Sequence, residues 1–288
     1  MARRRPATSV EGPAPGVGGL LGTVAAGSDT GRIRSNNEDN YLSFDLRRRT
    51  ILPAGGEVRV SFAAPGVLLA VADGMGGHSA GQVASQLCVE NLPTELLRVL
   101  PNPTQDAADL RPALIQAVQA TSDVIYHIAR EDRRYEGMGT TLTAALLRGT
   151  EAWVAQVGDS RAYLLRQGRL TPLTRDQTLA ESLTDLEGEA LPETPLQNML
   201  LQAVGAMSRL DVVVTTTELQ PGDFFLLCSD GLYRVVRHRQ IGEILARPGS
   251  LRAKVETLVA QANAGGGPDN VTALVCEVNS GRGQPTNR

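Results

Sequence analysis

Acidic residues recur in this chain beside glycine or asparagine, often at the ends of apolar runs. The five segments are Asn37-Glu38-Asp39, Ala72-Asp73-Gly74, Val157-Gly158-Asp159, Ser229-Asp230-Gly231 and Pro268-Asp269-Asn270. Three of them directly follow stretches that are typical of β-strands, at Gly66–Val71, Ala152–Val157 and Phe224–Cys228. A carboxylate at the end of a strand is held rigidly and points toward the end of the sheet, where the strands terminate. Several carboxylates that converge there repel one another unless a cation neutralises them.

The ligand chemistry of this pattern favours a hard cation. The candidate ligands are carboxylate oxygens, and no cluster of histidine and cysteine accompanies them. Oxygen ligands of this kind suit Mg²⁺ or Mn²⁺ better than zinc or copper. The sequence therefore predicts a site for divalent cations at the ends of the predicted strands.

Length and composition limit the remaining possibilities. A chain of 288 residues with 42% hydrophobic content can bury a substantial core in one or two domains. The net charge of -3 offers no basic field for nucleic acid, and the clusters Arg3–Arg5 and Arg47–Arg49 are too short to form one. No apolar run approaches the roughly 18–20 residues that span a bilayer, so we expect no membrane partner.

The cysteines and the N-terminal sequence indicate in which cellular compartment the protein is expected. Cys88, Cys228 and Cys276 are odd in number and lie in apolar patterns, which favours buried free thiols and a reducing, cytoplasmic setting. Prolines and glycines interrupt the apolar residues that follow Arg3–Arg5, so a signal peptide is not favoured. We expect residues 1–18 to form a flexible tail and residues 280–288 a C-terminal tail.

Strand and helix patterns fall into separate blocks along the chain. Helices are predicted at Ser79–Leu97, with a break or a second helical start at Pro93, and at Arg111–Arg134, Gln240–Ala246 and Leu251–Asn263. Strands are predicted at Leu21–Ser28, Asn40–Phe44, Val58–Ala63, Gly66–Ala72, Thr140–Leu147, Ala152–Val157, Arg161–Arg166, Val212–Glu218, Phe224–Cys228 and Val271–Val278. This segregation argues for an α+β fold, in which helices flank two packed antiparallel sheets. The polar, acidic segment 174–200 fits no element, and we interpret it as a mobile flap near the site.

Six short motifs lie along the chain: Ser28–Asp39, Ala72–His78, Gly139-Thr140-Thr141, Gly158–Arg161, Cys228–Leu232 and Pro268–Thr272. Together they resemble the metal-dependent serine/threonine protein phosphatases of type 2C, the PPM family, in its bacterial form. They occur in family order, and the match covers residues 20 to 278, nearly the whole chain. The resemblance implies a four-layer αββα sandwich with a catalytic domain over residues 19–279, including the flap at 174–200.

The resemblance also implies a centre of two Mn²⁺ or Mg²⁺ ions. Asp73 corresponds to the ligand that bridges both ions, and the carbonyl of Gly74 to a ligand of one of them. Asp230 and Asp269 correspond to ligands of the other ion. Two such ions suit the hydrolysis of a phosphate monoester, because they acidify a water and neutralise phosphoryl charge.

Further residues correspond to the surroundings of this centre. Glu38 matches the water-linked shell of the ion pair, and Asp39 matches the adjacent shell. Asp159, together with Asp230, resembles a third and weaker metal position of bacterial members. Arg34 corresponds to the arginine that binds phosphate, for which a planar guanidinium is well suited.

The leaving alkoxide of serine or threonine needs a proton, and His78 is the candidate donor. Two departures from the family pattern concern this part of the site. Met75 occupies the place where eukaryotic relatives have the histidine, directly after Asp-Gly. Asp176-Gln177 stands where bacterial relatives often have Asp-His, which affects the contacts of the flap. The implied partners are phosphorylated proteins, among them a Ser/Thr kinase and its targets, and the expected state is a monomer.

Individual residues also fit simpler structural roles. Any single Asp-Gly or Asp-Asn is an ordinary turn signal, Asp159 can simply support the turn at Arg161, and His78 can begin a helix. The spacing from Cys228 to Arg234 also fits cysteine-dependent phosphatases, although Cys276 and Arg282 share it in a predicted tail. A third alternative is a binding module on a phosphatase-like fold. The retention of all the central aspartates argues against that alternative.

Overall fold

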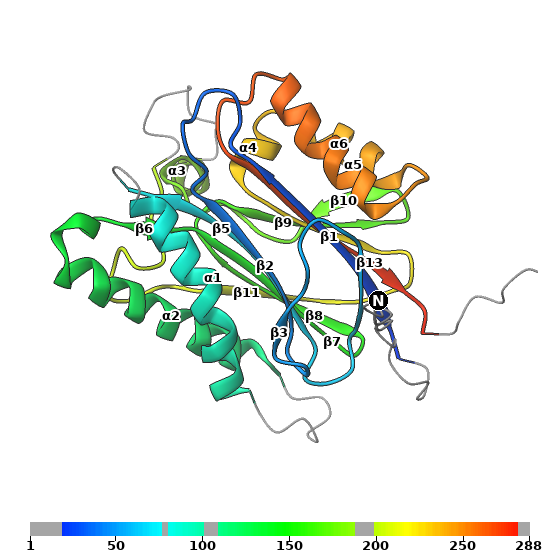
Figure 1. Ribbon diagram of the computed structural model, residues 1–288, viewed down its shortest axis with the longest axis horizontal. Helices are drawn as coiled ribbons and strands as arrows, with labels where there is room; N and C mark the ends of the chain where they lie inside the picture. Colours follow the sequence, from blue (N-terminus) through cyan, green and yellow to red (C-terminus); the bar gives the residue numbers. More distant parts are fainter. Residues whose placement is uncertain (1–18, 77–79, 101–108, 188–198, 282–288) are drawn as a thin grey trace, which may run out of the picture.

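The computed structural model describes residues 19–76, 80–100, 109–187 and 199–281, with the side chains of 184–187 excepted. The predicted tail at 1–18 and nearly all of the predicted tail at 280–288 lie outside these ranges. Two antiparallel sheets form the centre of the molecule (Figure 1). The first has six strands in the order β10 (Arg169–Pro172), β9 (Arg161–Arg166), β12 (Phe224–Cys228), β13 (Val271–Asn279), β1 (Leu21–Asp29) and β4 (Val58–Ser61).

The second sheet has seven strands. Its order is β11 (Val213–Glu218), β8 (Glu151–Val157), β7 (Leu142–Arg148), β5 (Val67–Met75), β2 (Asp39–Asp45) and β3 (Thr50–Ile51), with β6 (Gly139–Thr140) paired to the end of β5. Helices α1 (Ala80–Val99) and α2 (Arg111–Glu131) cover its outer face, and a 3-10 turn follows at Arg133–Tyr135. Helices α5 (His238–Ala246) and α6 (Leu251–Ala264) cover the outer face of the six-stranded sheet. The predicted αββα sandwich is therefore confirmed.

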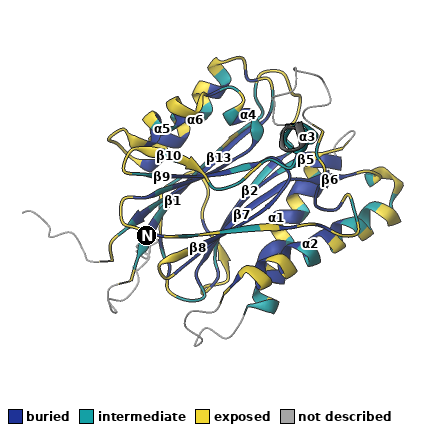
Figure 2. Cartoon of the chain, turned by 180° about the vertical axis from the view of Figure 1, so that it is seen from behind, coloured by how far each residue is buried: buried dark blue, intermediate teal, exposed yellow. Residues whose placement is uncertain are grey.

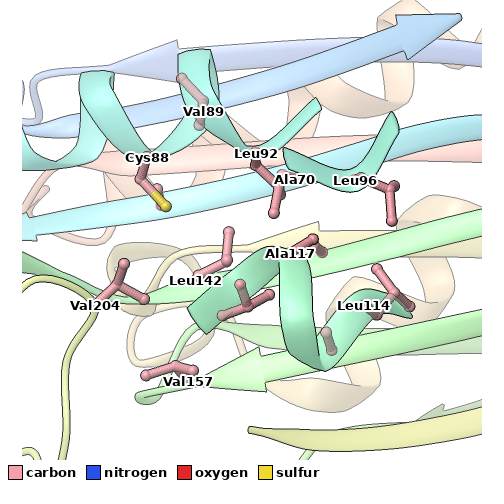
Figure 3. Packing of buried hydrophobic residues seen from close by; sticks show 14 of the residues in the cluster. Ala70, Cys88, Val89, Leu92, Leu96, Leu114, Ala117, Leu142, Val157 and Val204 are labelled. Atoms are coloured by element: carbon pink, nitrogen blue, oxygen red, sulfur yellow. The ribbon is translucent and has the colours of Figure 1, made fainter. Parts of the chain in front are cut away.

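The alternation of side chains along β5 explains the layers. Leu68, Ala70 and Ala72 point into the core beneath α1 and α2, where Figure 3 shows Ala70 close to Leu92 and Leu96. The intervening residues Val67, Leu69 and Val71 point into the core between the two sheets. Because successive side chains of a strand face opposite ways, a strand buried on both faces is a continuous apolar run. Figure 2 shows the same arrangement, with buried strands inside and exposed residues on the outer surfaces of the helices.

The structure corrects the sequence prediction in two places. Helix α1 continues through Pro93 without a break, and Pro93 itself is buried. A proline inside a helix costs about 3 kcal/mol, and here residues on both sides of it, such as Val89 and Leu96, pack into one core. Part of the predicted flap is the helix α3 (Leu179–Glu187). The short elements β3, β10 and α4 (Asp230–Tyr233) also had no counterpart in the prediction.

Candidate metal centre

The strand ends that carry the acidic residues meet at one end of the sandwich. Asp39, at the start of β2, is the register partner of Asp73 near the end of β5. Asp159 follows the end of β8, Asp230 follows the end of β12, and Asp269 precedes β13. In antiparallel sheets the end of one strand lies beside the start of its neighbour. Residues far apart in the chain are therefore brought to the same edge.

The electrostatics show that these carboxyl groups share one environment. Burial, followed by the charges of Asp39, Asp230 and other nearby aspartates, raises the pKa of Asp73 well above its ordinary value. Burial likewise raises the pKa of Asp39 to about 7, against hydrogen bonds from Ser229 and Thr272 that lower it. The pKa of Asp230 is raised to about 6, again chiefly by burial. Asp73 is half-buried as a whole residue, yet its carboxyl group lies among these neighbours.

Two of the buried carboxyl oxygens have no hydrogen-bond partner among the described residues: Oδ1 of Asp39 and Oδ1 of Asp230. The other oxygen of Asp39 accepts from the Ser229 hydroxyl at 2.6 Å and from the Thr272 hydroxyl at 2.8 Å. A buried polar atom without a partner is costly, and a cation can satisfy it. The arrangement therefore fits divalent cations.

Within the described ranges, no three His, Cys, Asp or Glu side chains lie close enough together to hold one ion. The aspartates therefore share one environment without closing around a single point. A hard ion such as Mg²⁺ keeps several waters, which can link it to carboxylates that it does not touch.

Two arginines enter the same centre. Arg34 donates from Nη2 to Oδ2 of Asp269 at 2.7 Å, and its side chain is 55% exposed. Arg234 donates to Asp159 at 3.0 Å and to Asp230 at 2.9 Å. Arg34 was predicted as a site residue. Arg234 was not, because the sequence pattern around it indicates only the spacing from Cys228.

Threonines and glycines fix the position of Asp73. The amide of Thr141 and the hydroxyl of Thr140 donate to the Asp73 carbonyl, and the Asp73 amide donates to the Thr141 hydroxyl. A Cβ atom on Gly74 would lie 2.1 Å from the carbonyl oxygen of Gly81, so only glycine permits this contact between β5 and α1. The sequence predicts Gly139-Thr140-Thr141 as a family motif, but it does not predict the role of this motif in holding Asp73.

Asn270 holds the loop that presents Glu38. Its side-chain oxygen accepts from the Glu38 amide at 2.8 Å, and its amide group donates to the carbonyls of Thr30 and Asn36. Asn36 in turn donates to a Glu38 carboxylate oxygen at 3.3 Å. The asparagine after Asp269 therefore carries a positioning task that its sequence pattern alone did not reveal.

The two departures from the family pattern have different outcomes. His78 lies outside the described residues, while Met75 is partly exposed at the end of β5. The side-chain oxygen of Gln177 accepts from the Gly158 amide at 2.7 Å, and the backbone amide of Gln177 donates to the Gly158 carbonyl. Asp176 pairs with Arg161 through two hydrogen bonds of 2.7 Å. The start of the predicted flap is thus anchored beside Asp159.

The cysteine alternative is wrong. Cys228 is completely buried in the core beneath α5 and α6, and burial raises its pKa further above the ordinary value. The nucleophile of a cysteine-dependent phosphatase must be an accessible thiolate. Arg234, the other residue of that spacing, is engaged with aspartates instead.

The fold and this acidic edge define a member of the metal-dependent phosphatase class. A family model described as protein phosphatase 2C matches residues 58–268, and the chain belongs to that family. Among curated relatives, the serine/threonine phosphatase stp of Listeria monocytogenes is 35% identical over 253 residues, covering 87% of this chain and 93% of the relative. PstP of Mycobacterium tuberculosis is 38% identical over 263 residues, but the chain spans only 45% of its length.

Solved structures agree with these relatives. The catalytic domain of PstP in complex with two manganese ions has a TM-score of 0.72 and 38% identity, and covers 90% of this chain. The serine/threonine phosphatase of S. agalactiae has a TM-score of 0.76 and 28% identity, and covers 89% of this chain. Each match spans 99% of the solved chain. Among the described helices, none is both long and apolar enough to cross a membrane.

Proposed function

We propose that this chain hydrolyses phosphoserine and phosphothreonine on proteins with the help of two Mn²⁺ or Mg²⁺ ions. The observation that carries the proposal is the meeting of Asp39, Asp73, Asp230 and Asp269 beside Arg34, at one edge of the sandwich. The Listeria relative, whose length the chain nearly spans, is a serine/threonine phosphatase. The PstP catalytic domain with its two manganese ions supports the choice of metal.

The proposed ligands are those that the family resemblance implies. Asp73 would hold both ions, the Gly74 carbonyl one of them, and Asp230 and Asp269 the other. Glu38 and Asp39 belong to the surrounding shell, where Asp39 also accepts hydrogen bonds from Ser229 and Thr272. When bound, the ions would lower the pKa of water and neutralise charge on the phosphoryl group.

Two further residues act on the substrate in this proposal. Arg34 is largely exposed and lies against Asp269, so its free nitrogens can turn to phosphate oxygens at the metal edge. His78, just before α1, is proposed to deliver the proton that the leaving alkoxide needs. The proposed domain spans residues 19–279 and includes the segment 174–200, of which residues 188–198 lie outside the described residues.

The setting of the enzyme is proposed on chemical grounds. Its substrates are phosphorylated proteins, and it opposes a Ser/Thr kinase by returning the kinase's products to the unmodified state. The three cysteines are buried and free, which suits the reducing cytoplasm. We propose that the chain acts as a monomer.

The test is hydrolysis of para-nitrophenyl phosphate and of a phosphothreonine peptide by the purified chain. We expect turnover with Mn²⁺, loss of turnover with EDTA, and recovery when Mn²⁺ is restored. A folded protein that binds Mn²⁺ but hydrolyses neither compound would overturn the proposal and favour the binding-module alternative. Circular dichroism on the same sample establishes that the chain is folded.

A further inference from the structure

One guanidinium group bridges two aspartates of the metal centre. Arg234 donates from Nε to Oδ2 of Asp230 at 2.9 Å and from Nη2 to Oδ2 of Asp159 at 3.0 Å. The side chains of Asp159 and Asp230 are 7% and 14% exposed, whereas that of Arg234 is 36% exposed. A positive charge of the protein itself therefore already lies between these two carboxylates.

The surrounding residues hold Arg234 in this position. The Arg234 amide donates to the Asp230 carbonyl, which closes the short helix α4. The neighbouring Tyr233 donates its hydroxyl to the carbonyl of Asp159 at 3.0 Å, and the guanidinium of Arg161 lies 3.7 Å from the centre of the Tyr233 ring. Arg161 is fixed in turn by its paired hydrogen bonds to Asp176. The backbone from which Arg234 extends is therefore fixed beside Asp159 and Asp230.

The charge of Arg234 points to a function for this contact. When metal is bound, its ligands must be deprotonated, so the proposed ligands Asp73, Asp230 and Asp269 are negatively charged in that state. Arg234 already supplies one positive charge to Asp230 and to Asp159. A third ion between Asp159 and Asp230 would meet the guanidinium at close range, where like charges repel strongly.

We propose that Arg234 takes the place of a third divalent ion between Asp159 and Asp230, so that this chain binds two metal ions. This inference rests on the proposed function, because it takes the two-ion phosphatase centre as given. It also assigns Asp159 a new role, as the partner of an arginine and not as a metal ligand. Arg234 is a positioning residue. It fixes the Asp230 carboxylate through Oδ2, while Oδ1 of Asp230 has no hydrogen-bond partner among the described residues.

The test counts bound Mn²⁺ per chain by equilibrium dialysis and atomic emission. We expect two equivalents in the wild type and three in Arg234→Gln, which keeps a polar but shorter side chain and removes its charge. Arg234→Lys, which keeps the charge, should stay at two equivalents. Arg239→Ala is a matched control and should also bind two equivalents. Arg239 pairs with an acidic residue four positions away, as Arg234 does, but its side chain is 90% exposed on the surface of α5.

Three equivalents in the wild type would overturn the inference, as would two equivalents in Arg234→Gln with wild-type circular dichroism. The wild-type count decides the question even if Arg234→Gln fails to fold. Hydrolysis is measured on the same samples. Two bound ions without hydrolysis would count against the proposed function, whereas three bound ions in an active wild type would count only against the role of Arg234.

Discussion

Asp39 and Asp73 face each other across the neighbouring strands β2 and β5, in direct register. Burial, and next the charge of Asp39, raises the pKa of Asp73. The hydroxyls of Ser229 and Thr272 hold Asp39, and the amide and hydroxyl of Thr141 hold the backbone of Asp73. Repulsion between like charges in one buried cluster is typical of a site that binds cations.

Asp73→Asn should reduce Mn²⁺-dependent hydrolysis by more than about 100-fold, because the bridging carboxylate is lost. The same change removes a buried carboxyl group that is difficult to ionise, so the metal-free protein should be more stable. A gain of about 1 kcal/mol corresponds to a melting temperature higher by roughly 2–4 °C. Thermal unfolding in EDTA and hydrolysis with Mn²⁺ measure the two effects. Near-normal turnover would remove Asp73 from the bridging position.

Arg34→Ala should chiefly raise KM for a phosphopeptide, by about 10-fold or more, since a charge-assisted hydrogen bond contributes about 1.5–3 kcal/mol. Arg34→Lys should recover only part of the loss, because an ammonium cannot contact two phosphate oxygens in the same fork. Steady-state kinetics on both variants provide the measurement. An unchanged KM in Arg34→Ala would place this arginine outside the substrate site.

The metal-free protein should lose stability as the pH rises from about 4 to about 7. The pKa of Asp39 is raised to about 7 and that of Asp230 to about 6 in the folded state, so the folded protein binds more protons than the unfolded chain in this range. The stability that these protonated carboxyl groups contribute is therefore fully present below their pKa in the unfolded chain. It is lost as the pH rises through their pKa values in the folded state. With saturating Mn²⁺ the trend should reverse, because metal ligands must be ionised.

Urea unfolding at pH 5.0 and pH 7.5, with EDTA or with Mn²⁺, measures this dependence. Asp39→Asn in EDTA is the control, because it removes one of the titrating groups and should flatten the pH trend. An equal fall in stability with pH in the presence and absence of Mn²⁺ would contradict the prediction.

Gly74→Ala should weaken Mn²⁺ binding and destabilise the fold by about 1–3 kcal/mol, the usual cost of forcing extra volume into a packed region. The new Cβ would lie 2.1 Å from the Gly81 carbonyl oxygen, and neither backbone segment can yield easily. Gly56→Ala is the matched control, because no atom lies within 4 Å of the Cβ it would add. Urea unfolding and Mn²⁺ titration of both variants check the prediction; equal stability of the two would contradict it.

Much of the fold can be predicted from local sequence patterns. The strand at Phe224–Cys228 was predicted with the boundaries that β12 has, and most other elements differ at their ends by a few residues. Continuous apolar runs bounded by Asp-Gly turns gave a strong signal there. The helix α3 was missed although Leu179, Leu183 and Leu186 recur at helical spacing, because the acidic residues and prolines around them favoured a loop.

Some features of the site follow from the amino-acid sequence and others from its packing. The sequence specifies which residue types are available: the aspartates beside glycine or asparagine, Arg34, and the order of motifs that marks the family. Which charges meet depends on the packed structure, because Arg234 contacts Asp159 across a separation of 75 residues. Local pattern records the conformational preferences of neighbouring residues, whereas electrostatic contact depends on distances that are set when the two sheets pack together.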